Sequence, residues 1–196
     1  MAYYILANQS YSYSSKKSKF HALSYFVKNI EEINSILSLL KDKYPDASHF
    51  PYAYIIGEYE YCSDDKEPKN SAGKQILNCL KSNNINSILI VVVRYFGGIE
   101  LGYRNLAKTF YKVTNELISN TQKYQKILKY SYTITFEYPS EPLINKKISS
   151  YVIKRNYNKN ITYELLLDSQ QIINEIKYLL ISYKFNSQEE EYQKIN

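Results

Sequence analysis

The stretch from Ser87 to Gly102, SILIVVVRYFGGIELG, constrains the fold more than any other part of the chain. Residues 88–93 are branched and apolar, without polar alternation. A strand with one face in water would alternate, so this run predicts a strand that is covered on both faces. It ends on Arg94 and two aromatic residues, and the Gly97–Gly98 pair that follows permits positive φ or a close approach of the backbone. The sequence therefore predicts a site at this end of a buried strand.

The composition is that of an ordinary soluble globular protein, because the 196 residues are 44% hydrophobic and 22% charged. The net charge of +6 permits an acidic partner such as RNA, although no dense basic block demands one. The longest apolar run is far shorter than the roughly 20 residues of a membrane span, and the first residues do not resemble a signal peptide. Cys62 and Cys79 lie outside any CxxC spacing, which favours two reduced thiols over a metal site. We therefore expect a cytoplasmic protein without membrane contact.

The first part of the chain contains patterns of both strands and helices. Strands are expected over Tyr3–Leu6, Lys19–Val27 and Tyr52–Tyr61. Asn29, followed three residues later by Glu32, is typical of a helix N-terminus, and Pro45 ends that helix. Apolar residues at spacings of three and four predict two further helices, one after Ser71 and one after Gly102.

The second part of the chain begins after a polar segment. Asn120–Gln125 has no apolar periodicity, so we place a linker there and divide the chain into domains 1–122 and 123–196. The pattern that follows has the order βαββαβ, which is typical of a ferredoxin-like domain. Its expected elements are strand 130–138, helix 143–153, a short strand near Tyr157, strand 161–167, helix 169–181 and strand 183–192. No catalytic arrangement of residues appears in this part.

A loop with three carboxylates, Asp64, Asp65 and Glu67, follows the third strand. Such a cluster suits a hard cation such as Mg²⁺, although its spacing matches no Ca²⁺ loop and a solvated acidic turn is the alternative. Lys74 then lies at the start of a helix, whose free amides and positive dipole end favour an anion. The spacing of a phosphate-binding Walker loop is missing, so this turn is a weak signal by itself.

The helix after Gly102 presents three cations, Arg104, Lys108 and Lys112, at a spacing of four. Cations at this spacing repel one another unless something acidic lies opposite, so the face either binds an anion or is simply solvated. His49, in the loop before the third strand, is either functional or a packing residue.

Four segments occur in an order that resembles the YigZ/IMPACT family: SKF at 18–20, DASHFPYAY at 46–54, SDDKEPKNSAGKQIL at 63–77 and VVVRYFGGIELG at 91–102. The two-domain layout resembles the bacterial branch of that family. The resemblance implies an α+β fold, with an N-terminal β-α-β sandwich similar to a domain of a small-subunit ribosomal protein and a ferredoxin-like C-terminal domain. It also implies binding to RNA or the ribosome and a role in translation regulation. No cofactor is expected.

Carried over by position, the resemblance implies a surface made of the acidic loop, the helix start and the strand end. Its members are His49, Asp64, Asp65, Glu67, Pro68, Ala72, Gly73, Lys74, Arg94, Tyr95, Phe96, Gly97, Gly98, Leu101 and Gly102. The sequence departs from the family where Asn70–Ser71 replaces a glycine–threonine pair and where Glu100 replaces a lysine. After Gly102, Tyr103–Leu106 replaces a segment with two further glycines. These changes remove open backbone and one positive charge, of which Arg104 could restore the charge.

We favour a non-enzymatic protein that binds RNA or the ribosome, since no nucleophile or general base is apparent. The predicted anion-binding residues are Lys74, Arg94, Tyr95, Phe96, Gly97, Gly98, Arg104, Lys108 and Lys112, beside a motif surface of His49, Asp64, Asp65, Glu67 and Gly73. The alternative is a metal-assisted enzyme acting on a phosphorylated small molecule or nucleotide, in which the three carboxylates hold a cation beside Arg94. A third interpretation is structural, in which the SDDKEP and RYFGG motifs hold each other by an Asp–Arg pair. We predict that these two motifs meet, with Asp64 or Asp65 within salt-bridge reach of Arg94 or Lys74. The oligomeric state is left open.

Overall fold

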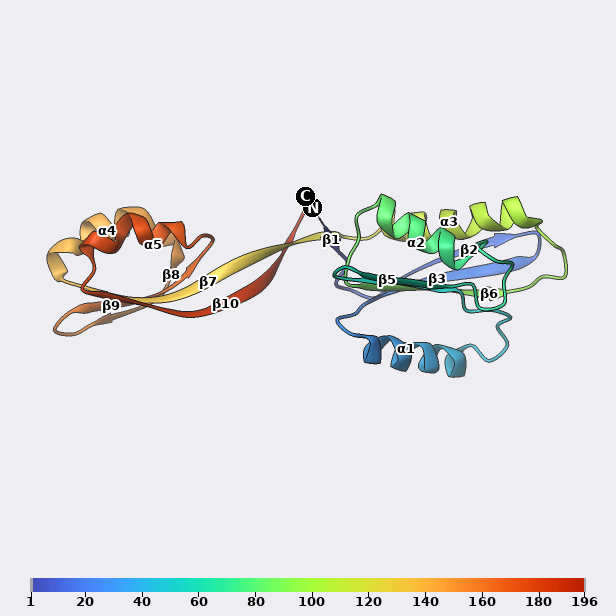
Figure 1. The fold of residues 1–196 in the computed structure, drawn as a ribbon, viewed down its shortest axis with the longest axis horizontal. Helices are drawn as coiled ribbons and strands as arrows, with labels where there is room; N and C mark the ends of the chain where they lie inside the picture. Colours follow the sequence, from blue (N-terminus) through green and yellow to red (C-terminus); the bar gives the residue numbers. More distant parts are fainter. Residues whose placement is uncertain (1, 196) are drawn as a thin grey trace. The chain divides into compact units, whose positions relative to one another are not determined.

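The computed structural model describes residues 2–195, and this part of the chain forms two compact units (Figure 1). The first unit runs to Gln125 and also includes Lys194 and Ile195. The second unit is Lys126–Gln193. Each unit has its own buried apolar core. No helix within residues 2–195 has both the length and the apolar character that a membrane crossing requires.

The first unit is built on one antiparallel sheet with the strand order β2-β3-β6-β4-β5. Its strands are β2 (Gln9–Ser15), β3 (Ser18–Phe26), β4 (Tyr52–Ile56), β5 (Tyr59–Ser63) and β6 (Ile88–Tyr95). Residues 88–93 of the central strand β6 are fully buried, which confirms the expectation of a strand covered on both faces. Nearby, the two-residue strand β1 (Tyr3–Tyr4) pairs with the first residues of β7 (Tyr124–Phe136).

Helices cover both faces of this sheet (Figure 1). Helix α1 (Ile30–Lys43) packs on the face of Leu89 and Val91, while α2 (Gly73–Ser82) and α3 (Tyr103–Ser119) pack on the opposite face. The expected start of α1 is confirmed, since Asn29 Oδ1 accepts a hydrogen bond from the Glu32 amide at 2.9 Å. The covered sheet leaves its strand ends and the loops between elements as the places where a site can form.

Two expectations about the strands were wrong. Residues 52–61 form a hairpin rather than one strand, because Gly57 adopts a φ of 61° and turns the chain between β4 and β5. The strand β2 was not expected, because Gln9–Ser15 alternates tyrosine with serine and contains no branched apolar residue. Lys16 and Lys17 form the turn between β2 and β3, with φ values of 46° and 65°.

The second unit contains the remainder of β7 and then α4 (Glu141–Ile148), β8 (Val152–Tyr157), β9 (Ile161–Leu167), α5 (Gln171–Ile176) and all but the last residue of β10 (Ser182–Lys194). Strand β10 pairs with β7, and the sheet continues through β9 to β8. This order confirms the ferredoxin-like βαββαβ domain and, with the first unit, the α+β class. The helices α4 and α5 lie on one face of the sheet (Figure 1) and contribute Ile144, Ile148, Ile173 and Ile176 to its core.

Both helices of the second unit are shorter than the pattern predicted. Each ends in a 3₁₀ turn, at Ser149–Tyr151 after α4 and at Lys177–Leu179 after α5. The chain leaves the first turn directly into β8 at Val152 and Ile153, which are β-branched and favour a strand. The helical periodicity of the sequence continued past the point at which the strand begins.

Candidate functional site

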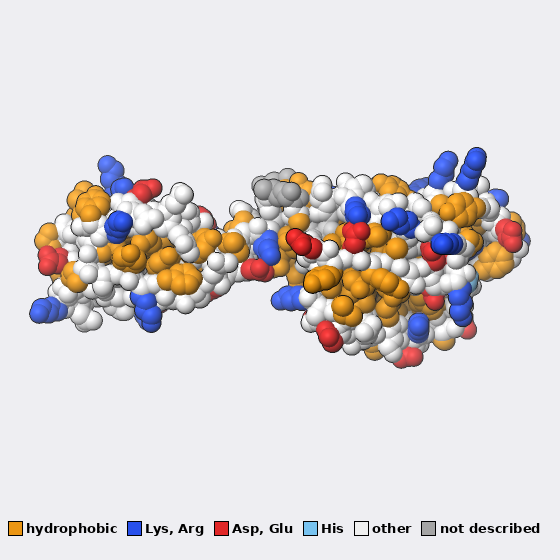
Figure 2. All heavy atoms as spheres, in the orientation of Figure 1, with side chains coloured by type: hydrophobic (Ala, Val, Ile, Leu, Met, Phe, Trp, Pro, Cys, Tyr) orange, Lys and Arg blue, Asp and Glu red, His pale blue; other side chains and the backbone are white. Residues whose placement is uncertain are grey.

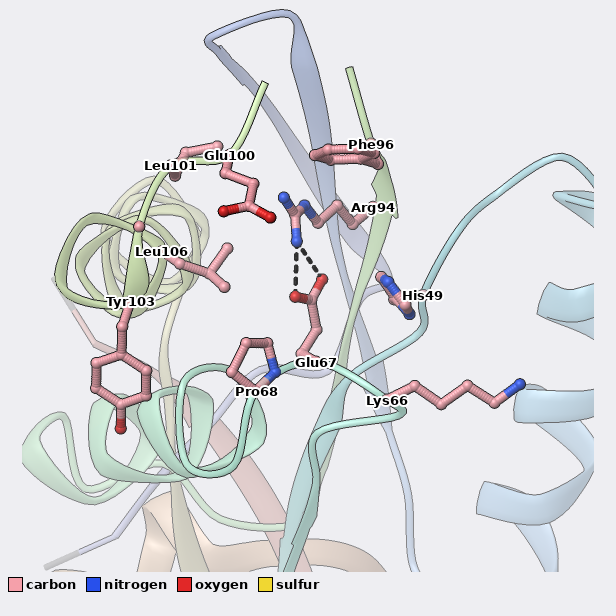
Figure 3. A pocket seen from close by; sticks show the side chains of 11 residues that line it. His49, Lys66, Glu67, Pro68, Arg94, Phe96, Glu100, Leu101, Tyr103 and Leu106 are labelled. Atoms are coloured by element: carbon pink, nitrogen blue, oxygen red, sulfur yellow. Dashed lines mark hydrogen bonds and ion pairs between the residues drawn. The ribbon is translucent and has the colours of Figure 1, made fainter. Parts of the chain in front are cut away.

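A buried ion pair lies at the end of the central strand β6. Arg94 Nη1 donates hydrogen bonds to Glu67 Oε1 at 2.7 Å and to Oε2 at 2.6 Å (Figure 3). Arg94 is 5% exposed and Glu67 is 6% exposed. The guanidinium carbon lies 5.4 Å from the ring centroid of Phe20 and 5.5 Å from that of Phe96, within the range of cation–π attraction. The loop that carries three carboxylates therefore closes on the strand-end arginine.

A tight turn places Glu67 under Arg94. Asp65 and Lys66 adopt left-handed φ values of 41° and 69°, and the Glu67 amide donates to the Asp64 carbonyl at 3.0 Å. This geometry reverses the chain within four residues, so the side chain of Glu67 turns back toward β6. Neither central residue of the turn is glycine, so the conformation is held by the surrounding hydrogen bonds.

The two aspartates of the loop bind backbone amides, so the expected pairing of either with Arg94 or Lys74 was wrong. Asp64 accepts hydrogen bonds from the amides of Asn70, Ala72 and Gly73 at 2.8–3.0 Å and so caps the start of α2. Asp65 Oδ2 accepts from the Phe50 amide at 2.6 Å. Asp64 reaches amides that follow it in the chain and Asp65 reaches the segment before β4, whereas the longer glutamate reaches across to the strand. The SDDKEP and RYFGG motifs do meet, but through the ion pair of Glu67 with Arg94.

The three carboxylates thus face three different partners. Within residues 2–195 no group of three potential metal-ligating side chains comes together. The metal-assisted alternative required Asp64, Asp65 and Glu67 to converge on one point, and this geometry removes its main support.

Glycine is required where two backbones touch at this site. A Cβ on Gly73 would overlap the backbone of Ser63, and a Cβ on Gly97 would overlap the backbone of Lys17. Gly97 also donates its amide to Ser18 Oγ at 3.1 Å. These contacts fix the acidic loop against α2 and the end of β6 against the β2–β3 turn.

His49 joins the site through both its backbone and its ring. Its backbone forms an antiparallel bridge with Arg94, whose amide donates to the His49 carbonyl at 2.9 Å. The ring atom Nδ1 lies 3.0 Å from the Asp65 carbonyl oxygen. Because a carbonyl can only accept, Nδ1 must carry the proton in this contact, and a neutral His49 presents the lone pair of Nε2.

A cavity of about 310 Å³, the strand-end cavity, opens beside the ion pair. It is lined by His49, Lys66, Glu67, Pro68, Arg94, Phe96, Glu100, Leu101, Gly102, Tyr103 and Leu106 (Figure 3). Its wall combines the apolar side chains of α3 with the buried guanidinium and the carboxylate of Glu100. The ion pair thus forms part of its lining.

A second depression of about 250 Å³, the lysine groove, lies between β2 and α3. It is lined by Tyr13, Ser15, Lys16, Leu101, Asn105, Lys108, Thr109 and Lys112. The Nζ atom of Lys112 lies 4.2 Å from the ring centroid of Tyr13, and Lys16 Nζ donates to the Glu100 carbonyl at 3.4 Å. No carboxylate lines this groove among the residues that the structure describes. Figure 2 shows lysine and arginine side chains projecting along the α2–α3 side of the first unit.

The structure separates the predicted anion-binding residues into two groups. Lys74, Arg104, Lys108 and Lys112 are exposed, and none has an ion-pair partner within residues 2–195. Arg94 is buried, Tyr95 and Gly97 are half-buried, and Phe96 and Gly98 are exposed. Arg94 and Lys74 are therefore not exposed together.

Sequence reasoning missed two residues of the lysine groove. Tyr13 belongs to the strand that the pattern did not reveal, and Lys16 lies in the turn that follows that strand. The alternation of tyrosine and serine at residues 10–14 was the available signal, because strict alternation is typical of a half-buried strand.

The fold and the site together define a class of two-unit α+β proteins in which an acidic loop closes on a strand-end arginine. The family model described as the Impact N-terminal domain matches residues 16–118. The chain is 31% identical to the IMPACT family member YigZ of Escherichia coli over 128 residues, which cover 63% of each chain. It is 27% identical to YvyE of Bacillus subtilis over 164 residues, 80% of this chain and 75% of that one.

A solved crystal structure of a protein described as hypothetical covers 100% of this chain and 97% of its own, with a TM-score of 0.62 and 23% identity. That likeness supports the fold over both units. The chain belongs to the IMPACT family.

Proposed function

We propose that this chain is a non-enzymatic, cytosolic RNA-binding protein that contacts RNA, free or within the ribosome, in the regulation of translation. The observation that carries the proposal is the lysine groove, in which Lys16, Lys108 and Lys112 surround a depression that no carboxylate lines within residues 2–195. Unpaired lysines that line a groove attract phosphates and release counterions when they bind them. The family resemblance adds the expectation of a ribosomal or RNA partner.

Within this proposal, Arg94 has a supporting role. Its charge is already neutralised by Glu67, and Glu100 lines the same cavity, so it is poorly placed to bind a negatively charged phosphate. It joins the end of β6 to the acidic loop through Glu67 and to His49 through a backbone bridge. The exposed rings of Phe96 and Tyr103 beside it offer surfaces on which unpaired bases can stack.

The enzymatic alternative is less well supported. A metal-assisted reaction on a phosphorylated substrate needs ligands that converge, and Asp64 and Asp65 instead bind the amides of α2 and of Phe50. No other described group takes over the role of a metal ligand set.

Titration of a labelled uridine oligonucleotide across a salt series tests the proposal. Each phosphate contact with single-stranded RNA contributes about −0.7 to the slope of log K against log salt, so three to five contacts give roughly −2 to −3.5. Replacing Lys108 and Lys112 together with alanine is expected to flatten the slope by about one unit. Co-sedimentation of the chain with ribosomes over the same salt series separates a ribosomal target from free RNA.

The matched control is the pair Lys41→Ala and Lys43→Ala in the last turn of α1, on the other face of the sheet. It removes the same charge from the same unit, so it is expected to leave the slope nearly unchanged if binding occurs at the groove. Absence of binding at low salt to both RNA and ribosomes would overturn the proposal. Equal effects of the two lysine pairs would remove the groove as the site.

A further inference from the structure

We propose that the strand-end cavity binds the guanine base of an unpaired nucleotide and that Glu100 determines this specificity. The inference rests on the proposed RNA-binding function and names the base that the same surface selects. It follows from the hydrogen-bonding groups that line the cavity, from its exposed rings and from the position of the lysine groove beside it.

Arg94 supplies the donors. Both hydrogen bonds to Glu67 use Nη1, so two donors of the side chain have no hydrogen-bond partner among the residues that the structure describes: Nη2, and also Nε, which is itself buried. A buried guanidinium with an unused donor is uncommon, because buried polar groups almost always find a partner. The guanidinium lines the cavity, as Glu100 does (Figure 3), so an acceptor atom of a ligand in the cavity would lie within reach of Nη2.

Glu100 supplies the acceptors. Its carboxylate lies on the cavity side of the segment before α3 (Figure 3), and it has no ion-pair partner within residues 2–195. The carboxylate of Glu67 is already held by Arg94, which leaves Glu100 as the available carboxylate of this cavity. His49 adds the Nε2 lone pair when its ring is neutral.

Guanine matches this arrangement of donors and acceptors. Its Watson–Crick edge presents two adjacent donors, N1–H and N2–H, which a carboxylate can accept together, and its O6 and N7 atoms accept from arginine. Adenine, cytosine and uracil each lack the pair of adjacent donors. A phosphate group, in contrast, would be repelled by Glu100, so a charged ligand group is directed away from the cavity.

The surroundings fit a nucleotide rather than an isolated base. Phe96 is 48% exposed and Tyr103 is 53% exposed, so each offers a ring on which a base can stack. The cavity and the lysine groove both include Leu101, and Lys16 contacts the Glu100 carbonyl. A base in the cavity would thus place its phosphates toward the lysines.

The test compares uridine oligonucleotides that carry a single central guanosine, adenosine or inosine. We expect the guanosine oligonucleotide to bind about tenfold more tightly than the adenosine one, the effect of one bidentate contact. Inosine, which lacks the N2 amino group, should bind with intermediate affinity. Glu100→Gln should abolish the preference, because an amide presents one donor where the carboxylate presents a second acceptor.

Two further variants sharpen the result. Glu100→Lys should tighten binding to all three oligonucleotides and steepen the salt slope, while it removes the preference for guanosine. Glu58→Gln, an exposed glutamate in the β4–β5 turn, is the matched control and should retain the preference. Circular dichroism of each variant verifies the fold.

Titration of GMP and AMP, followed by NMR signals of His49 and Phe96, separates this inference from the proposed function. Shifts with GMP but not AMP support the base cavity even where longer RNA does not bind. RNA binding that follows the salt slope but shows no base preference, with no GMP shifts, would overturn the inference and leave the proposed function intact. Absence of both would overturn both.

Discussion

The cations at the end of β6 and those on α3 lie in the same unit but in opposite environments. Arg94 is 5% exposed and bound to Glu67 on one nitrogen, whereas Lys108 and Lys112 are exposed and have no ion-pair partner within residues 2–195. The first belongs to a segment that carries the family resemblance, and the others to a helix face that a solvated surface could also explain. The comparison teaches that the arginine of that segment holds the site together through its buried ion pair, while the lysines of α3 keep their charge unpaired within residues 2–195.

The difference has a physical basis in desolvation. A charge moved out of water is tolerated when a partner and further hydrogen bonds replace the water, as Glu67 does for Arg94. An arginine suits this position, because its flat guanidinium can also lie against Phe20 and Phe96. Lysines that remain hydrated lose little when they exchange water for a phosphate.

The largest effect is expected from Glu67→Gln, which tests the buried side of the comparison. The change leaves the Arg94 charge buried and uncompensated, so the free energy of unfolding should fall by about 3 kcal/mol or more. Urea unfolding of the full chain measures it. Glu58→Gln removes an exposed carboxylate of the same unit and should change stability by less than about 0.5 kcal/mol. Similar small effects of both changes would show that the pair does not stabilise the unit.

Replacement of Gly97 tests how tightly the strand end is held. Gly97→Ala places a Cβ on the backbone of Lys17, and we expect a loss of about 3 kcal/mol from this overlap. Gly98→Ala meets no neighbouring atom, but its φ of 78° is left-handed, so its expected cost is about 1 kcal/mol. Thermal unfolding of the two variants compares them. A larger loss for Gly98→Ala would place the constraint in the turn rather than in the contact with the β2–β3 hairpin.

A smaller effect is expected from Asp64→Ala, which removes the cap of α2. Three backbone amides lose their acceptor, and the loss should be about 1–2 kcal/mol, as for other helix caps. Asp64→Asn retains one acceptor oxygen and should recover part of it. Urea midpoints of the two variants check the order, and a greater loss for asparagine than for alanine would contradict the assigned role.

Much of the fold followed from periodicity in the sequence. The unbroken apolar run of β6, the Asn29 cap and the βαββαβ order of the second unit each depend on local patterns that neighbouring residues display directly. Strand β2 was not predicted, because serine and tyrosine carry little apolar signal. The β4–β5 hairpin was not predicted, because a single glycine makes its turn. Secondary structure is therefore easiest to predict from the sequence where apolar residues are branched and closely spaced.

The ion-pair partner of Arg94 could not be predicted from local sequence patterns. Three carboxylates lie within four residues, and the choice among them depends on the left-handed turn at Asp65 and Lys66. That conformation is held by contacts from Phe50 and His49, which are distant in sequence. The sequence predicted that the two motifs meet, but the identity of the pair required the three-dimensional turn.

The salt dependence of RNA binding in two double variants tests the central claim most directly. Arg94→Met with Glu67→Leu replaces the buried pair by apolar side chains, a change that is often neutral for folding. Lys108→Ala with Lys112→Ala removes the exposed pair, and a uridine oligonucleotide serves as the probe so that base preference plays no part. The account predicts that the first variant keeps the slope of the unmodified chain and that the second flattens it by about one unit. A flattened slope in the first variant, with an unchanged slope in the second, would contradict it.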